Sequence, residues 1–470
     1  MKSINPPPSS PPAVPRWGVR LAAIVLLGTL LLMLVALLRP ATPPPPPPTN
    51  PNLARTPMTV THSGRSLSPG AMPADFTPPP ARPAEEIVAE KLTQFASNRA
   101  ELVTAMAKHF NVEIPPDVAR FFAAAQAGNW PETTNLFNTL KQQRMTNDRP
   151  PGLEKLWPAI VETYGVAEQT HAWPAQQLLD YGNAILDSLR PGMIYVGGTD
   201  TGRFIPALLS ETSGGEPHIV LTQNALADAS YLDYVKFQYG DKLNALTGDD
   251  SQNSFKDYID DAKKRLQHDQ DFPNEPKQIR PGEDVQMKDG RVQVSGQVAV
   301  MAINERLLQT LLQKNPDLSF ALSESFPLKS FYGEATTLGP VTELRATDAA
   351  NALTPEHAAQ SLDYWRSTTQ TLLANPEAAA SSTAREAYTK LILGQVGLFV
   401  DRKLPAEAEQ ALQFVTSLSP ANSEGVFRYV KLLADQNRFA EARQIVQTAI
   451  NAAPDNEQFR GLLTNLEKAK

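Results

Sequence analysis

Two stretches near the C-terminus decide how this part of the chain folds: PAEAEQALQFVTSLSP at 405–420 and FAEARQIVQTAINAAP at 439–454. They superpose at an offset of 34 residues, with a shared Ala-Glu-Ala run near the start and a proline at the end. Small residues where two helices cross, and a proline that closes the second helix, are typical of repeated helical hairpins. The aligned positions are Ala406, Glu407, Ala408 and Pro420 with Ala440, Glu441, Ala442 and Pro454.

This period and spacing are the tetratricopeptide pattern. Ala442, Ala449 and Pro454 fall on pattern positions, whereas Val430 replaces the usual small glycine. Only two repeats are clear, so we expect them to stack on helices from 355–400, with 456–468 as a capping helix. A helical bundle of another kind is the alternative for this region. Tetratricopeptide arrays bind peptides or proteins in a concave groove, so the pattern predicts a protein or peptide partner for these repeats.

The composition limits the remaining possibilities. A chain of 470 residues with 41% hydrophobic and 20% charged residues is long enough for two or three globular domains. The formal net charge of -7 argues against a nucleic-acid partner, which normally requires a basic surface. The absence of cysteine excludes disulfides, thiolate catalysis and cysteine-ligated metals. We expect no metal and no cofactor.

One apolar run predicts a membrane anchor. Residues 21–38 carry no charge and are bracketed by Arg20 and Arg39, which predicts a transmembrane helix over 17–39. A cleaved signal peptide is the alternative, but the run is longer than a usual signal core. Basic residues are more frequent before the run than after it, which favours a cytoplasmic tail at 1–16 and places the bulk of the chain on the other side.

Proline content marks the next boundary. Residues 40–84 include six consecutive prolines at 43–48 and too few apolar residues to pack, so we expect a disordered linker. A proline-motif ligand for a partner module is the alternative use of this segment. Helical periodicity then predicts a helical module over 85–190, with helices in the following ranges: 84–110, two within 115–143 joined at GNW, 153–165 and 174–189.

Residues 191–346 alternate between strand-like and helix-like segments. This order predicts an α/β domain with a mostly parallel sheet and flanking helices, followed by tetratricopeptide-like hairpins over 347–470. A hairpin is expected to turn at Gly339–Pro340, and 268–290 is expected to be a long polar loop. The expected strands lie in 192–198, 218–222, 290–300 and 317–325, and the expected helices in 204–211, 227–240 and 301–315.

Ligands of parallel sheets bind beyond the carboxyl ends of the strands. The loops expected there are 197–203, 222–228 and 323–330, which makes their polar residues candidate ligand-binding residues. The stretch GGTDTGR is neither of the glycine-rich phosphate motifs, however. We favour the alternative in which the glycines make a turn, Asp200 caps the next helix and Arg203 pairs locally. The candidates are Thr199, Asp200, Arg203, Gln223, Asn224, Asp228, Glu324 and Ser325.

Several longer stretches resemble a bacterial family of membrane-anchored tetratricopeptide proteins for which no activity is established. They are GGTDTGRF, HDQDFPNEPKQIRPGEDV, RVQVSGQVAVMAIN, SESFPL and VFRYVKLLADQNR. The family usually carries proline where this chain has Thr201. The resemblance implies a single-pass protein of the bacterial inner membrane. A more distant similarity links the central module to the soluble part of protein O-mannosyltransferase-like proteins, whose multi-pass catalytic region this chain lacks.

These observations lead to two functional hypotheses. The first is a single-pass, membrane-anchored interaction scaffold whose C-terminal repeats bind a protein or peptide. The second is an extracytoplasmic glycan- or small-ligand-binding domain, or an enzyme associated with glycosyl transfer, that uses the three strand-end loops. No catalytic motif is recognisable in the sequence, which favours the scaffold.

Overall fold

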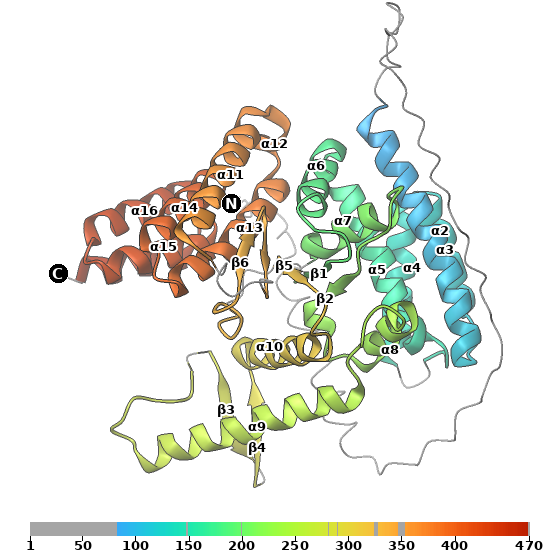
Figure 1. Cartoon of the computed structure of the whole chain (residues 1–470), viewed down its shortest axis with the longest axis horizontal. Helices are drawn as coiled ribbons and strands as arrows, with labels where there is room; N and C mark the ends of the chain where they lie inside the picture. The colour runs from blue at the N-terminus through green and yellow to red at the C-terminus, as the bar shows by residue number, and fades with distance from the viewer. Residues whose placement is uncertain are drawn as a thin grey trace, which may run out of the picture. The chain divides into compact units, whose positions relative to one another are not determined.

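The computed structural model describes residues 82–146, 149–198, 200–280, 282–288, 290–323, 328–345 and 353–468 (Figure 1). All of them belong to one compact unit that runs from Ala81 to Lys470. Within these residues, no helix combines the length and the apolar character needed to cross a membrane. The predicted tail at 1–16, the span at 17–39 and nearly all of the linker at 40–84 lie outside the described residues.

The helices predicted between residues 84 and 189 are confirmed. Asn129 caps one of them with its side chain, and Pro131 occupies the first turn, where its missing N–H costs nothing. The fourth helix runs seven residues further than its predicted end at 165 and includes Pro158 near its start. The helices are α2 (Ala84–Phe110), α3 (Pro116–Gln126), α4 (Trp130–Met145), α5 (Leu153–Ala172) and α6 (Ala175–Leu186).

A five-stranded sheet follows, in the order β2-β1-β5-β7-β6. Strand β1 is parallel to β2 and to β5, but β7 is antiparallel to both β5 and β6. The sheet is therefore mixed, and the prediction of a mostly parallel sheet is wrong. The tight turn at Gly339–Pro340, which was predicted, makes β6 and β7 antiparallel, and this hairpin joins the sheet through the antiparallel pairing of β7 with β5. The strands are β1 (Ile194–Gly197), β2 (Val220–Thr222), β5 (Phe320–Leu322), β6 (Thr336–Leu338) and β7 (Val341–Glu343).

Between β1 and β5 the chain forms α7 (Asp200–Glu211), the short η1 (Gln223–Ala225), α8 (Ala229–Tyr239), α9 (Gly248–Asp271) and α10 (Gln297–Lys314). The sequence analysis missed α9 because few of its residues are apolar, although its N-terminus has a Thr247–Asp250 capping box. The loop predicted at 268–290 instead contains the end of α9 and strand β3 (Asp284–Lys288).

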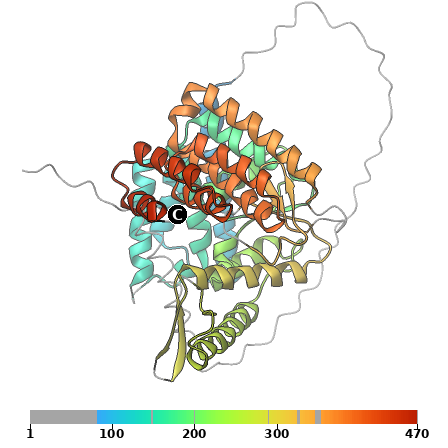
Figure 2. The same cartoon turned by 90° about the vertical axis from the view of Figure 1, so that its left-hand side faces the viewer.

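The strand predicted at 290–300 also needs correction. It ends at Ser295 as β4 (Arg291–Ser295) and pairs with β3 in a separate two-stranded sheet. Gly296, with φ 93°, then turns the chain directly into α10. In both Figure 1 and Figure 2, α9 and this hairpin lie together, with α10 between them and the five-stranded sheet.

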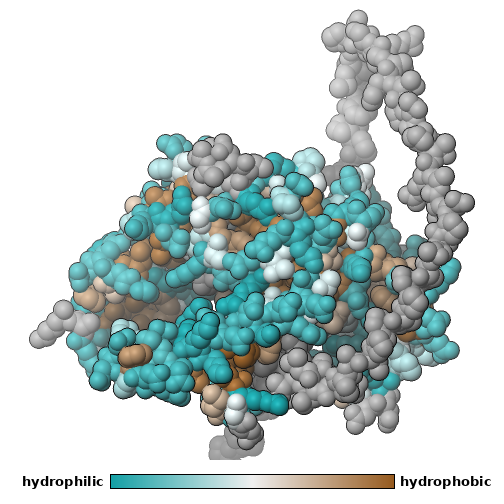
Figure 3. All heavy atoms as spheres, turned by 60° about the horizontal axis from the view of Figure 1, so that its bottom comes forward, coloured by the Kyte–Doolittle hydropathy of each residue, from teal (hydrophilic) through white to brown (hydrophobic). Residues whose placement is uncertain are grey.

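Neighbouring residues of the five-stranded sheet enter two different hydrophobic cores. Tyr195 and Ala321 pack into a core that continues through α6, α7 and the C-terminal helices. Val196, Phe320 and Leu322 pack into a second core with α5, α8 and α10. Both faces of the central strands are therefore covered, as the period-two alternation of side chains requires. The face shown in Figure 3 is mostly hydrophilic, with hydrophobic residues in small patches.

The C-terminal region is helical, and the 34-residue repeat of its sequence also appears in its backbone conformation. Helices α14 (Pro405–Leu418) and α16 (Phe439–Ala452) are offset by 34 residues, since they begin at 405 and 439. The two non-glycine residues with left-handed φ in this region, Lys403 (58°) and Asn437 (60°), are also 34 positions apart. The other helices are α11 (Pro355–Ala374), α12 (Pro376–Ala380), α13 (Ser382–Asp401), α15 (Ser423–Asp435) and the predicted capping helix α17 (Glu457–Lys468).

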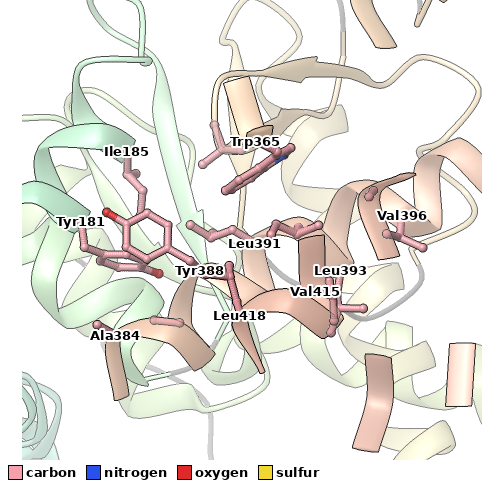
Figure 4. Packing of buried hydrophobic residues seen from close by; sticks show 14 of the residues in the cluster. Tyr181, Ile185, Trp365, Ala384, Tyr388, Leu391, Leu393, Val396, Val415 and Leu418 are labelled. Atoms are coloured by element: carbon pink, nitrogen blue, oxygen red, sulfur yellow. The ribbon is translucent and has the colours of Figure 1, made fainter. Parts of the chain in front are cut away.

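One buried glutamine joins the repeats to the sheet. Gln395 of α13 is 1% exposed, and its Nε2 donates to the carbonyls of Gly339 (2.9 Å) and Val341 (3.0 Å). Its Oε1 accepts from Ser361 Oγ (2.5 Å) and Trp365 Nε1 (2.8 Å) of α11. The apolar residues around this junction, which include Trp365 and Leu391, fill the space between α6, α11 and α13 (Figure 4).

We expect Gln395→Leu to destabilise the protein by about 2–4 kcal/mol, because two carbonyls and two donors would be left buried without partners. Chemical denaturation of the purified chain measures the change. The matched control is Gln413→Leu, because Gln413 is exposed and has only a long hydrogen bond of 3.4 Å to Tyr429. A Gln395 variant as stable as the Gln413 variant would show that the junction depends on apolar packing alone.

Candidate functional site

The first helices of successive repeats present equivalent residues on one face. At the 34-residue spacing, Leu393 and Gly397 of α13 correspond to Phe427 and Lys431 of α15. Leu393 is fully buried, whereas Phe427 is 40% exposed and Lys431 has a side chain that is 75% exposed. The same face is therefore covered on α13 and open on α15.

The segment between β5 and β6 covers this face of α13. A Cβ on Gly397 would lie 2.6 Å from the hydroxyl oxygen of Tyr332, so the side chain of Tyr332 packs directly against the backbone of α13 at this position. Nearby, Arg402 donates from Nη1 to the carbonyl of Gly333 at 3.1 Å. The chain itself thus occupies the first part of the surface that a tetratricopeptide array usually offers to a partner.

The open part of the surface lies on α15 and α17. The ring of Phe427 lies 6.5 Å from the buried ring of Phe459, measured between centroids, so an apolar anchor faces solvent with support beneath it. Lys431 lies one turn further along α15 and pairs with Asp435 at 2.9 Å, a contact that is exposed and therefore weak. An exposed aromatic residue with a polar rim is suited to binding an apolar side chain of another protein.

Charged side chains hold the two repeats together beside this surface. Arg438 precedes α16 and contacts Glu409 of α14 at 2.6 Å and Glu441 of α16 at 2.7 Å. The hydrogen bond from Arg438 also holds the pKa of Glu441 below its usual value. These contacts tie the start of α16 to α14, on either side of α15, which packs against both helices.

A second, smaller candidate site lies at the carboxyl ends of β1 and β5. It is a pocket of about 150 Å³ that joins the start of α7, the end of β5, helix α6 and the first turns of α13. Two of the three predicted loops meet here, whereas the 222–228 loop contributes no lining residue. Small-molecule pockets usually measure about 300–1,000 Å³, so this one is smaller than a usual ligand site. It is lined by Tyr181, Thr201, Gly202, Ser323, Ser382, Thr383, Glu386, Ala387, Lys390 and Leu391.

The ligand-binding residues predicted from the sequence do not gather at one point, and those that the structure describes have different neighbours. Arg203 donates from Nη1 to Thr222 Oγ1 at 2.8 Å, and its guanidinium carbon lies 4.1 Å from the ring centre of Phe204. Asp228 caps α8 through the backbone N–H groups of Ser230 and Tyr231. Asp200 is the first residue of α7, Gln223 is buried in η1, and Asn224 is exposed, while Thr199, Glu324 and Ser325 lie outside the described residues.

Close backbone approach explains Gly197 in the glycine-rich loop. A Cβ at this position would lie 2.7 Å from the carbonyl oxygen of Gly202 and 2.9 Å from the Cα of Arg203. The Tyr195 hydroxyl hydrogen-bonds to the same Gly202 carbonyl and lies 2.5 Å from Ser323 Oγ, which ties the loop to the end of β5. Thr201 donates from Oγ1 to Gln169 Oε1 at 3.1 Å.

The residues from α13 are the part of this pocket that sequence reasoning missed. Ser382, Glu386 and Lys390 lie on one face of that helix and reach the strand ends through the long-range packing of α13 against α6 and β7. No local signal in the sequence marks this contact. In the part of the chain that the structure describes, no group of three or more His, Asp or Glu side chains could hold a metal ion.

Comparisons with known proteins agree with the repeat assignment. A family model described as the tetratricopeptide repeat matches residues 399–466, which run from the end of α13 to near the end of α17. No curated protein and no solved structure matches the chain significantly. The chain therefore contains tetratricopeptide repeats, and this supports a role in protein–protein interaction. The comparisons give no support to the similarity with O-mannosyltransferase-like proteins.

We expect Gly197→Ala to destabilise the protein by about 1–3 kcal/mol, because the added methyl group would clash with backbone atoms that cannot move independently. Thermal or chemical unfolding measures the change. Gly214→Ala is the control, since a Cβ there meets no atom within 4 Å and its φ is not left-handed. Equal stability of the two variants would contradict the close-packed turn.

Proposed function

We propose that this protein is a single-pass, membrane-anchored interaction scaffold of the bacterial inner membrane. In this proposal the α/β region and the repeats lie outside the cytoplasm, and the open surface of α15 and α17 binds a protein partner. The observation that carries the proposal is the exposed Phe427, at the repeat position whose equivalent on α13 is covered by the chain itself.

Three features support protein binding over catalysis. The tetratricopeptide match covers α15 and α17, and the aromatic anchor at Phe427 lies within it. The strand-end pocket, by contrast, is about 150 Å³ and is closed on one side by α13. The candidate residues Arg203 and Asp228 contact neighbouring groups of the fold. A glycan- or small-ligand-binding domain, or an enzyme associated with glycosyl transfer, that uses the three strand-end loops therefore has less support.

The sequence supports the membrane part of the proposal. The uncharged run at 21–38 is as long as a membrane-spanning helix needs, and the proline-rich residues that follow would act as a spacer. Basic residues before the run favour a cytoplasmic N-terminus.

Site-directed photocrosslinking tests the partner surface. A photoreactive phenylalanine analogue at position 427 should give a discrete protein adduct in intact cells, whereas the same analogue at Gln447, an exposed residue of α16, should not. Once the partner is identified by mass spectrometry, Phe427→Asp should weaken its binding at least about tenfold, because an aromatic anchor contributes about 2 kcal/mol or more.

Gln447→Asp is the matched control and should bind the partner as the unchanged protein does. Adducts of equal yield from both positions, or a Phe427→Asp variant of unchanged affinity, would contradict the proposed surface. Unfolding curves of both variants show whether either change acts through stability instead of through the surface.

Membrane fractionation tests the anchor. The full chain should remain in the membrane pellet after an alkaline carbonate wash, and a variant lacking residues 17–39 should appear in the supernatant. Added protease should digest the part after residue 40 in spheroplasts, because the proposal places it outside the cytoplasm. A mature N-terminus downstream of residue 39 would show instead that the apolar run is a cleaved signal peptide.

A further inference from the structure

A larger pocket lies beside the start of the edge strand β2, away from the carboxyl ends of β1 and β5. Its volume is about 360 Å³, which falls within the range of about 300–1,000 Å³ that small-molecule sites usually occupy. It is bounded by α2, α5, α7, the residues that lead into β2, and the end of α8. None of the ligand-binding residues predicted from the sequence lies in its lining.

The floor of this pocket holds a buried cation between two carboxylates. Arg99 of α2 is 4% exposed, and its Nε lies 3.0 Å from Glu162 Oε2 while its Nη1 lies 2.6 Å from Glu211 Oε2. The hydroxyl of Tyr234 donates to Glu162 at 2.5 Å, and Asn98 Nδ2 donates to Glu211 Oε1 at 3.1 Å. One guanidinium thus faces two carboxylates.

The pKa of Glu211 is raised, and burial is the largest cause. Burial raises the pKa of this carboxyl group, and the charge of Glu162 raises it further, against the opposing effect of Arg99. Such a carboxylate lacks part of the positive charge that would stabilise it. A second cation placed in the pocket would supply that charge.

Hydrogen-bond acceptors are also in excess. The carboxamide oxygen of Gln238, from α8, is buried and has no hydrogen-bond partner among the described residues. His218 Nδ1 lies 3.0 Å from the carbonyl of Met193, which can only accept, so Nδ1 carries a proton and donates to this carbonyl. A ligand suited to this pocket must therefore bring donors.

The charges at the rim do not restore the balance. Lys242 contacts Glu216 at 2.9 Å, an exposed residue that is not part of the lining. Asp241, which is part of the lining, adds a further negative charge. Counted over the lining, two basic side chains oppose three acidic ones. Leu102, Ala207 and Ile219 supply an apolar wall alongside these polar groups.

We propose that this pocket binds a small organic cation with a primary ammonium group. The ammonium donates to the Glu211 carboxylate and, once the Gln238 carboxamide turns toward the pocket, to Gln238 Oε1, and the alkyl part of the ligand packs on Leu102, Ala207 and Ile219. A bare metal ion does not fit the same evidence, because no group of three His, Asp or Glu side chains in the described residues could hold one.

Calorimetric titration of the full chain tests the proposal. The probes are butylamine and 1,4-diaminobutane, with butan-1-ol as a control for the apolar wall and tetramethylammonium as a control for charge without donors. Both amines should bind saturably with a Kd of about 1 mM or tighter, and neither control should bind. The absence of saturable binding of either amine up to about 10 mM would overturn the proposal.

Variants then locate the binding. Glu211→Gln and Gln238→Leu should each weaken amine binding at least about fivefold, since each removes one acceptor of the ammonium group. Glu216→Gln is the matched control, because it removes an exposed acid just outside the lining and should leave the Kd unchanged. An unchanged Kd in both Glu211→Gln and Gln238→Leu would show that the amine binds elsewhere and would overturn the proposal.

A third variant separates loss of binding from loss of folding. Ala207→Leu keeps every charge but fills part of the space, so it should abolish amine binding if the pocket is the site. Thermal unfolding with and without diaminobutane accompanies each titration. Ligand-induced stabilisation of the unchanged chain that disappears in Ala207→Leu supports the site, whereas equal stabilisation in both contradicts it.

Discussion

The four hydrogen bonds of the Gln395 carboxamide fix how the repeats sit on the sheet. Apolar contacts around the junction would tolerate a rotation or a one-residue shift of α13, because they are not directional. The carboxamide does not tolerate this, since its donors meet two carbonyls of the β6–β7 turn and its oxygen meets two donors of α11. Burial of unpaired polar groups is costly, so only one arrangement satisfies all of them.

Because Gln395 fixes α13 on the sheet, this helix has two structural roles. It is the first helix of the repeat array, and it also covers the mixed sheet beside β7. The side chain of Tyr332 packs against the backbone of α13 at Gly397, and the first turns of α13 line one side of the pocket at the strand ends. The surface that remains open for a partner is therefore displaced by one repeat, onto α15 and α17. Under the proposed function, the sheet region therefore determines which part of the repeat array is available for binding.

Local patterns predicted most of the fold, and long-range contacts account for the rest. The 34-residue period, the caps and prolines of the early helices, and the Gly339–Pro340 turn are signals within a few residues or one repeat. Helix α9 was not predicted, because its buried residues are largely polar, among them Ser251, Ser254, Arg265 and Asp269. Neither the contact of α13 with the sheet nor the Arg99 pocket could be predicted, because each depends on segments far apart in the sequence.

The Arg99 cluster and Gln395 differ in how completely their polar groups are paired. At Gln395 every donor and acceptor of the carboxamide is used, so its polarity is accounted for by structure alone. Around Arg99 the carboxylates outnumber the cation, and a nearby acceptor is unused. Buried ion pairs are often no more stabilising than apolar residues of the same volume, and an unbalanced cluster is less so. Stability therefore gives a poor account of this cluster, whereas binding of a positively charged donor accounts for both the surplus charge and the unused acceptor.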